Sequence, residues 1–371
     1  MSKIKVLHII KSLGRGGAEM LLPETLKLHD QEQFEFHYIY FLPWKNQMVE
    51  SIEKSGGFVT CLSAKNNIQL IFQAKRIIRY CKQNHIQLIH CHLPWAGFVG
   101  RLVHKLSQIP VIYSEHNMQE RYHKITAEIN KFSFNSQTLA LGVSEDVTNS
   151  INKNIAPKIR VETLLNGVNT ETFRRELAGP DRKNLGIPEH AIVVGNVAVF
   201  RFQKRLVEWL CVFNELQNRS TKPVYGVIVG AGPLEEEIKA KLKELRLERK
   251  VILTGLQTEV KPFYSIMDIF MMSSSFEGLP IALLEAMSMQ CAIVSTNAGG
   301  IKEVIRHEVD GLICDVENLN KLGELAYEVV EDDLLRSKLQ NNARSRVLKN
   351  FSLNTMVHKL ENYYKEFSQL P

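Results

Sequence analysis

Two carboxylates flank a predicted helix start in the second half of the sequence. Glu277 lies in the segment Ser273–Pro280, and Glu285 follows eight residues later within a helix predicted over 281–290. Because this helix is apolar nearly all round, it is predicted to be buried, and a buried carboxylate requires hydrogen-bond donors. A pair of vicinal hydroxyls, such as a ribose diol, would supply them. The alternative is an exposed Glu285 next to a solvated loop.

The start of the same helix is suited to an anion. The apolar run 268–272 before it is predicted to be a buried strand, and Pro280 is well placed as the first helical residue. Amides in the first turn have no partner within the helix, and the helix dipole places positive charge there. A phosphate would therefore find donors at four amides, those of Gly278, Leu279, Ile281 and Ala282.

A cationic stretch and a glycine-rich turn also follow predicted strands. Three cations come directly after the strand predicted over 191–199, namely Arg201, Lys204 and Arg205. They could face a diphosphate, where they would neutralise charge on a departing phosphate, or form a solvated loop. The turn Gly14–Gly17 follows the first strand and opens a helix, so it could approach an anionic ligand or be a tight turn without one.

Histidines close two other predicted strands. His90 and His92 alternate on a strand over 88–92 and point the same way, but no third ligand is evident. No metal site is therefore predicted, and a role in orienting a loop is favoured. His116 lies just past the strand 111–114, where a functional loop belongs, although a lone histidine is more often structural. No cofactor is expected.

These residues lie on an alternation of strands and helices that occurs twice along the chain. Such alternation predicts two doubly wound α/β domains with mostly parallel sheets, whose ligands bind beyond the carboxyl ends of the strands. The active site is therefore expected in the cleft between the domains. The predicted boundaries are 1–170 for the first domain, 171–190 for a linker, 191–350 for the second domain and 351–371 for a C-terminal helix.

The composition is that of a globular protein without membrane-spanning segments. The 371 residues are 44% hydrophobic and 23% charged, and no apolar run approaches the roughly 20 residues of a spanning helix. The six cysteines form no Cys-x-x-Cys pair, and the N-terminus lacks a secretory cleavage pattern. These features predict a cytoplasmic protein.

The net charge of +6 is unevenly distributed. Residues 1–175 hold 22 Lys and Arg against 14 Asp and Glu, a net +8, whereas the remainder holds 24 against 26, a net −2. The basic first half suggests an anionic partner. Nucleic acid is not expected, because aromatic residues are not interleaved with the basic ones. The helix predicted over 68–85 is basic and amphipathic, and it could rest on an anionic membrane surface or simply pack on its own sheet.

The segment Glu277–Glu285 resembles the Glu-x7-Glu signature of the retaining family 4 glycosyltransferases, which have the GT-B fold. The resemblance implies two Rossmann-like domains, a C-terminal helix that packs back on the first domain, and no need for a metal. Five other stretches resemble family motifs in the same order and extend the resemblance over nearly the whole chain: Gly14–Glu19, Ile89–His92, Leu165–Asn169 with Phe173, Val229–Leu234 and Gly299–Ile305.

The resemblance also implies roles for individual positions. Glu277 would contact hydroxyls of the transferred sugar, Glu285 the ribose diol and Lys204 the diphosphate. His116 would lie near the C6 hydroxyl of the sugar and the reaction centre. The donor-binding set would further include the first-domain glycines, one cation and the helix start, that is Gly16, Gly17, Arg201, Gly278, Leu279, Pro280 and Ile281.

Two positions depart from the family pattern. The family usually has arginine five residues before the lysine, where this chain has Val199. Arg201 lies two residues further on and would face the same side on a regular strand, so it could substitute for that arginine. Asn169 replaces the usual aspartate.

The sequence therefore predicts a retaining, metal-independent hexosyltransferase whose donor is a nucleotide diphosphate sugar, with a UDP-sugar expected. The acceptor would be a saccharide or lipid-linked oligosaccharide in the synthesis of a cell-surface polysaccharide or glycolipid, at the inner face of the cell membrane. The predicted catalytic residues are His116, Glu277, Lys204 and Arg201. Two alternatives remain, a nucleotide-sugar epimerase and a non-catalytic subunit that binds nucleotide sugars.

Overall fold

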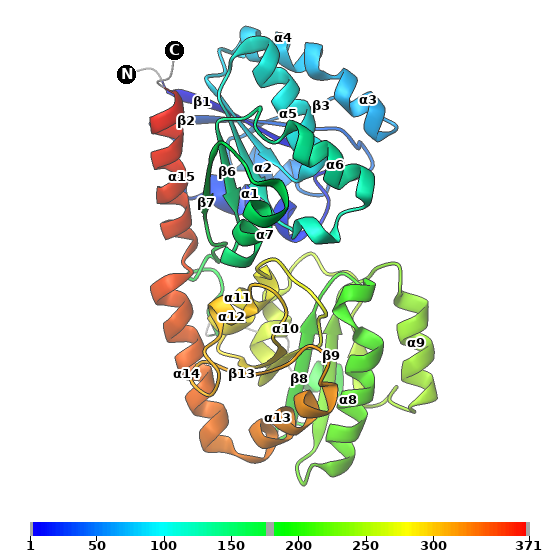
Figure 1. Cartoon of the computed structure of the whole chain (residues 1–371). Coiled ribbons are helices and arrows are strands. Elements are labelled where there is room, and N and C mark those ends of the chain that lie inside the picture. The colour runs from blue at the N-terminus through cyan, green and yellow to red at the C-terminus, as the bar shows by residue number, and fades with distance from the viewer. Residues whose placement is uncertain (1–2, 176–181, 369–371) are drawn as a thin grey trace. The chain divides into compact units, whose positions relative to one another are not determined.

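A computed structural model describes residues 3–175 and 182–368 of the chain. These residues form two compact units, coloured along the chain in Figure 1. The first unit contains the described residues up to Asn166 and those from Leu353 onward, and the second runs from Gly167 to Ser352. The linker predicted over 171–190 includes residues 176–181, which lie outside the described residues.

The first unit is built on a seven-stranded sheet in which neighbouring strands are parallel. The strand order is β3-β2-β1-β4-β5-β6-β7. The chain adds β2 and β3 on one side of β1 and the later strands on the other side, so the order reverses between β1 and β4. The central strands are buried apolar runs, as a sheet covered on both faces requires. The strands are β1 Ile4–Ile10, β2 Phe34–Tyr40, β3 Phe58–Cys61, β4 Leu88–His92, β5 Val111–Glu115, β6 Leu139–Gly142 and β7 Arg160–Thr163.

Helices connect these strands, and a segment from the far end of the chain joins them. Helix α15, drawn in red in Figure 1, packs against β1, β4 and α1, and it adds Leu360, Tyr364 and Phe367 to the core of the first unit. The helices of this unit are α1 Gly17–Leu26, α2 Val49–Lys54, α3 Asn67–Phe72, α4 Ala74–Asn84, α5 Pro94–Ser107, α6 Lys124–Ser133, α7 Glu145–Ile155 and α15 Leu353–Ser368.

The single helix predicted over 68–85 is wrong, because the segment is divided into α3 and α4 at Gln73. The backbone of Gln73 has φ −71° and ψ −10°, and the Gln73 side chain donates to the carbonyl of Ser63 at 3.3 Å. The apolar spacing runs through this point, and neither glycine nor proline marks it. The local sequence therefore does not reveal the break.

The second unit is built on a six-stranded parallel sheet with the order β10-β9-β8-β11-β12-β13. Here the chain reverses its progress between β8 and β11. The prediction of two doubly wound α/β domains is thus confirmed. The strands are β8 Ile192–Val197, β9 Val224–Val229, β10 Val251–Leu253, β11 Ile269–Met272, β12 Ala292–Thr296 and β13 Leu312–Cys314.

The helices of the second unit cover this sheet and close an apolar core around Trp209 and Phe213, whose rings stack with centroids 5.3 Å apart. The Trp209 indole donates to the carbonyl of Met271 at 2.9 Å, so it fixes α8 on β11. The helices are α8 Leu206–Arg219, α9 Glu235–Glu244, α10 Lys261–Ile266, α11 Ile281–Ser288, α12 Ile301–Val304, α13 Leu319–Glu331 and α14 Asp333–Asn350.

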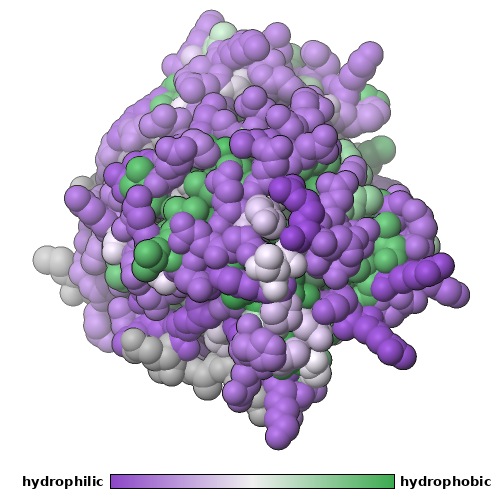
Figure 2. Space-filling model, turned by 90° about the horizontal axis from the view of Figure 1, so that it is seen from below, coloured by the Kyte–Doolittle hydropathy of each residue, from purple (hydrophilic) through white to green (hydrophobic). Residues whose placement is uncertain are grey.

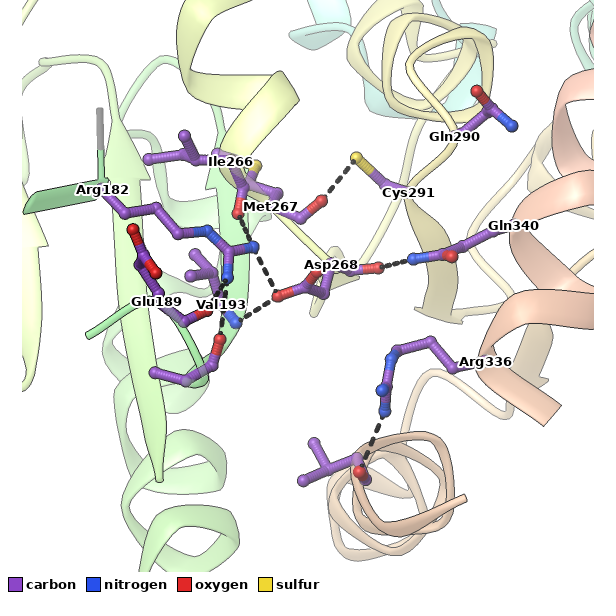
Figure 3. A network of polar contacts seen from close by, with 12 residues as sticks. Arg182, Glu189, Val193, Ile266, Met267, Asp268, Gln290, Cys291, Arg336 and Gln340 are labelled. Carbon is purple, nitrogen blue, oxygen red and sulfur yellow. Dashed lines mark hydrogen bonds and ion pairs between the residues drawn. The ribbon is translucent and has the colours of Figure 1, made fainter. Parts of the chain in front are cut away.

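A polar network holds the amino end of β11, the end opposite to the Glu277 loop (Figure 3). The Asp268 carboxylate forms an ion pair with Arg182 at 2.9 Å and accepts the amide of Val193 at 2.8 Å. Gln340 of α14 reaches the Asp268 carbonyl from the other side at 3.1 Å. Because these groups satisfy one another, we interpret the network as structural.

The face of the molecule seen in Figure 2 is mainly hydrophilic, with hydrophobic residues interspersed. Scattered apolar residues of this kind are normal on protein surfaces. In the described part of the chain, none of the helices combines the length and the apolar character that a membrane span requires.

Candidate functional site

Lys204 and Glu277 form an ion pair at the carboxyl end of the second sheet. The Lys204 Nζ lies 2.5 Å from Glu277 Oε1, and both side chains are largely buried, with exposed fractions of 18% and 10%. Lys204 ends a short turn after β8, and Glu277 lies in the loop after β11. Since β8 and β11 are the neighbours at which the strand order reverses, the pair occupies the point where open α/β sheets bind ligands.

Serine hydroxyls order the Glu277 loop. The Ser274 hydroxyl donates to Glu277 Oε1 at 2.7 Å, so the same carboxylate oxygen accepts from a hydroxyl and an ammonium. The Ser273 hydroxyl lies within 2.9 Å of the carbonyls of Lys204 and Arg205 and ties the two loops together. Contacts within the protein therefore hold the Glu277 carboxylate in place.

The helix α11 begins at Ile281, the start of the predicted range, but Pro280 is not part of it. Pro280 is the N-cap, with an extended backbone of φ −72° and ψ 120°, and Ile281 is the first helical residue. The prediction of Pro280 as the first helical residue is therefore wrong by one position, because its ψ angle is not helical. Among the described residues, the amides of Gly278, Ile281 and Ala282 donate to no protein acceptor, whereas Leu279 does have a polar contact.

A glycine allows the neighbouring turn to approach this helix start. Gly299 has φ +58°, and a Cβ placed there would lie 2.0 Å from the carbonyl oxygen of Glu277. The next amide, that of Gly300, donates to the carbonyl of Gly278 at 2.9 Å. Only glycine permits this close approach, which fixes the backbone directly after Glu277.

Glu285 is buried on α11, with an exposed fraction of 6%. The Tyr264 hydroxyl donates to Glu285 Oε2 at 2.8 Å, and burial together with the Glu285 charge raises the pKa of Tyr264 well above its ordinary value. Burial of Glu285 agrees with the sequence interpretation, but Tyr264 was missed as its partner. The two residues are 21 positions apart, and no local pattern links them.

The cations after β8 have separate roles. Lys204 pairs with Glu277, whereas Arg205 donates to the carbonyl of Val316 at 2.7 Å and so has a structural partner. Arg201 is exposed, and within the described residues its guanidinium contacts no acceptor. The strand β8 ends at Val197, so the argument that Val199 and Arg201 face one side of a regular strand is wrong. Arg201 therefore lies in the loop after β8, directly before the turn Phe202–Lys204, and not on the strand.

The first unit carries the remaining candidate residues at the carboxyl end of its own sheet. Gly16 is the N-cap of α1 and Gly17 its first residue, directly after the loop that follows β1. Lys11 was missed by the sequence interpretation. It lies in the same loop, and burial and the nearby charge of Lys45 lower the pKa of its ammonium. Its amine donates to Asn67 at 2.8 Å.

His116 follows β5 and is held by the buried carboxylate of Glu115. The amides of His116 and Asn117 donate to Glu115 Oε1 at 2.9 and 3.2 Å. Side chains complete the shell, since Tyr122 donates to the same oxygen and the other oxygen accepts from Tyr113 and Gln119. Burial lowers the pKa of His116 to about 4, so this imidazole is neutral near pH 7. Its Nε2 is buried without a partner among the described residues.

A histidine that the sequence interpretation missed completes a cluster with His90 and His92. His8 of β1 pairs with His90 in the register of β1 and β4, and His8 Nδ1 lies 2.9 Å from His92 Nε2. His90 contacts the hydroxyls of Tyr364 and Ser114 at 2.7 and 2.8 Å. The expectation that no third histidine joins the pair is therefore wrong, because strand order rather than sequence distance brings His8 there.

The candidate residues thus fall into two groups. The second unit brings together Lys204, Glu277 and the start of α11, with Glu285 further along that helix. The first unit contains the α1 glycines and His116. Each group lies at the carboxyl ends of parallel strands, where such sheets bind ligands. The group in the second unit offers free amides, one cation and two carboxylates.

Two doubly wound units of this kind define the GT-B class of glycosyltransferases. A family model described as Glycosyltransferase Family 4 matches residues 15–172, and one described as Glycosyl transferases group 1 matches residues 179–346. The chain belongs to glycosyltransferase family 4.

Two relatives span nearly the whole chain. The UDP-Gal:alpha-D-GlcNAc-diphosphoundecaprenol alpha-1,3-galactosyltransferase of Escherichia coli is 23% identical and covers 98% of this chain and 97% of its own. The N-acetylgalactosamine-N,N'-diacetylbacillosaminyl-diphospho-undecaprenol 4-alpha-N-acetylgalactosaminyltransferase of Campylobacter jejuni is 26% identical over 91% of this chain and 93% of its own.

Solved structures have the same fold. HepE of Anabaena in complex with UDP and glucose has a TM-score of 0.85 at 17% identity, with 98% of this chain and 100% of that chain covered. A glycosyltransferase from Rickettsia africae has a TM-score of 0.84 at 19% identity, with both chains fully covered.

Proposed function

We propose that this chain is a retaining hexosyltransferase that moves a sugar from a UDP-sugar to a hydroxyl of a saccharide or lipid-linked oligosaccharide. The observation that carries the proposal is the Lys204–Glu277 ion pair beside the start of α11. The names of both relatives specify a diphosphoundecaprenol-linked sugar, and HepE was solved with UDP and glucose. These support a nucleotide diphosphate donor, a lipid-linked acceptor and a role in cell-surface polysaccharide or glycolipid synthesis.

The donor would bind the second unit through three contacts. Its diphosphate accepts from the amides of Gly278, Ile281 and Ala282 and from the Lys204 ammonium, with Leu279 and Pro280 forming the wall of the turn. Its ribose hydroxyls donate to Glu285, and hydroxyls of the transferred sugar donate to Glu277. Lys204 must leave Glu277 for the diphosphate, and this exchange frees the Glu277 carboxylate for the sugar.

Charge stabilisation would be the main catalytic contribution. The bond from the anomeric carbon to UDP breaks while the acceptor oxygen bonds the same face of that carbon. The acceptor proton goes to an oxygen of the departing phosphate, so no protein nucleophile is needed. Lys204, the helix start and the exposed Arg201 stabilise the charge on UDP, in place of a metal.

Residues of the first unit would act on the sugar and the acceptor. His116 is neutral near pH 7 and has a buried, unpartnered Nε2, so it can hydrogen-bond the C6 hydroxyl of the transferred sugar. Gly16 and Gly17 at the start of α1 leave room for a phosphate of the donor or acceptor.

The first unit would also contact an anionic membrane at the cytoplasmic face, where a lipid-linked acceptor is found. Helix α4 buries Ala74, Ile77 and Cys81, while its exposed face carries four cations. On the preceding α3, Ile68 and Phe72 are 66% and 76% exposed. Basic residues beside exposed apolar ones are typical of helices that lie on anionic lipid.

The proposal is tested by a transfer assay with UDP-sugars and undecaprenyl diphosphate-linked sugars, in which NMR reports the anomeric configuration of the product. Transfer with retention supports the proposal, and inversion contradicts it. Interconversion of the donor sugar without acceptor would indicate an epimerase. Donor binding in a thermal-shift screen without transfer to any acceptor would indicate a non-catalytic subunit.

A further inference from the structure

Three histidines of the first unit converge on one face of the sheet. His8 and His90 are directly paired across β1 and β4, and His92 lies two residues further along β4. One ring nitrogen from each of the three lies within 4.8 Å of those of the other two. The ring centroid of His90 is 4.2 Å from that of His92 and 5.1 Å from that of His8.

Two of these rings already share one position for a proton. His8 Nδ1 lies 2.9 Å from His92 Nε2, so one neutral imidazole donates to the other. A tetrahedral zinc ion bound to both nitrogens at 2.0–2.1 Å would hold them about 3.3 Å apart. If a metal ion replaced the shared proton, the distance between these two nitrogens would therefore increase by only about 0.4 Å.

The three histidines lie in the interior of the first unit. They are almost fully buried, with exposed fractions of 2% for His8, 1% for His90 and 7% for His92.

A small cavity adjoins the cluster. It has a volume of about 20 Å³, and although aliphatic side chains form much of its lining, the three histidines, Ser114 and His116 also line it. Three of the histidines that line this cavity have a buried ring nitrogen without a hydrogen-bond partner among the described residues, namely His8 Nε2, His92 Nδ1 and His116 Nε2. A cavity of this size holds one water, which needs polar partners of this kind.

We propose that His8, His90 and His92 bind a divalent transition-metal ion, with zinc as the expected metal. The ion binds His8 Nδ1, His92 Nε2 and one nitrogen of His90, and a water in the adjoining cavity supplies the fourth ligand. The other nitrogen of His90 keeps a hydroxyl partner, since Tyr364 and Ser114 contact the two sides of that ring. Such outer partners orient metal-bound histidines.

The position of the site gives it a structural role. β1 and β4 carry the ligands, and Tyr364 belongs to α15, so the ion would join the two central strands and the C-terminal helix. The inference is independent of the donor site in the second unit. Cobalt(II) is a useful probe, because it occupies zinc sites and its visible spectrum reports tetrahedral nitrogen ligation.

The test measures metal binding by the full chain. Protein stripped with a chelator is titrated with Co²⁺ and Zn²⁺, and the bound metal is counted after dialysis. We expect one equivalent, a tetrahedral Co²⁺ spectrum and a higher unfolding temperature with metal. His8→Gln and His92→Gln should lose both the equivalent and the spectrum, and Tyr364→Phe should weaken binding about 10-fold.

His358→Gln is the matched control, because this histidine lies on α15 with a side chain that is 79% exposed. It should bind metal as the wild type does. Folding of each variant is checked by circular dichroism and thermal unfolding in chelator. The inference is overturned if the wild type retains no metal, if the Co²⁺ spectrum is octahedral, or if both glutamine variants bind like the wild type.

Discussion

Lys204 Nζ and Glu277 Oε1 lie 2.5 Å apart on loops that follow adjacent strands of the second sheet. Each side chain is thus the charge partner of the other. A diphosphate at the start of α11 would attract the Lys204 ammonium, and a sugar hydroxyl would replace that ammonium at Glu277. Both residues are therefore required for transfer.

Lys204→Met and Glu277→Gln should each lower the rate of transfer by about 100-fold or more. Loss of Lys204 removes charge stabilisation from the departing UDP, and loss of Glu277 removes the carboxylate that holds the sugar. The measurement is initial-rate kinetics of product formation. The matched control is Lys239→Met, an exposed lysine of α9 that pairs with Glu235. Near-normal turnover in either test variant would show that its assignment is wrong.

Glu285→Ala should weaken UDP binding by about 10-fold, because a charge-assisted hydrogen bond to the ribose is lost. The sharper measurement compares UDP with 2′-deoxyuridine diphosphate by calorimetry. The wild type should prefer UDP, and the variant should lose that preference. Equal discrimination in both proteins would place the ribose elsewhere. Tyr264→Phe should retain the preference, because the tyrosine contacts Glu285 rather than the ligand.

The first unit should become less stable as the pH falls below about 6.5. Burial keeps the pKa of His116 at about 4 and that of His90 at about 3, against an ordinary value of 6.5. Below pH 6.5 the unfolded chain therefore binds protons that the folded chain does not. For each such histidine, the free energy of unfolding falls by up to about 1.4 kcal/mol per pH unit until its folded pKa is reached.

Urea unfolding at pH 7, 6 and 5, in the presence of a chelator, measures this dependence. In His116→Asn the free energy of unfolding should fall less steeply with falling pH than in the wild type, by the contribution of about one histidine. If the slopes of the wild type and His116→Asn coincide, His116 does not titrate as described.

Glu115→Gln should lower the free energy of unfolding by about 1–3 kcal/mol. A glutamine has only one acceptor oxygen, so its NH2 group would face either the amides of His116 and Asn117 or the donors on the other side of the carboxylate, which are Tyr113 and Gln119. The measurement is the denaturant midpoint, with the exposed Glu128→Gln of α6 as the control. An unchanged midpoint would indicate that the loop does not depend on Glu115.

Replacing the four exposed cations of α4 with glutamine should abolish sedimentation with vesicles of anionic lipid at low salt; these are Lys75, Arg76, Arg79 and Lys82. The attraction is electrostatic and is screened beyond about 8 Å at physiological salt. Neutral vesicles are the lipid control. Failure of the wild type to sediment at low salt would end the membrane proposal.

The sequence predicts the surroundings of Glu277 well because local features determine them. An apolar strand, a glycine-proline turn and an apolar helix are adjacent in the chain, so the strand–loop–helix unit and the burial of Glu285 follow from spacing. The alternation of elements likewise predicts both sheets. The break at Gln73 and the end of β8 at Val197 were not predicted, because apolar residues continue past both points in the sequence.

The partners of these residues required the three-dimensional structure. Tyr264 reaches Glu285 from α10, and His8 reaches His90 and His92 through the pairing of β1 with β4. In both cases distant positions meet because of strand order or helix packing. Single residues such as these carry no periodic signal, so a sequence without its fold offers no means to pair them.

The most direct measurement of the central claim is a crystal structure of the protein with UDP. The account predicts a diphosphate on the amides at the start of α11, the Lys204 ammonium moved from Glu277 to a phosphate oxygen, and both ribose hydroxyls at Glu285. A nucleotide bound elsewhere, or one bound there with the Lys204–Glu277 pair intact and the ribose away from Glu285, would contradict it.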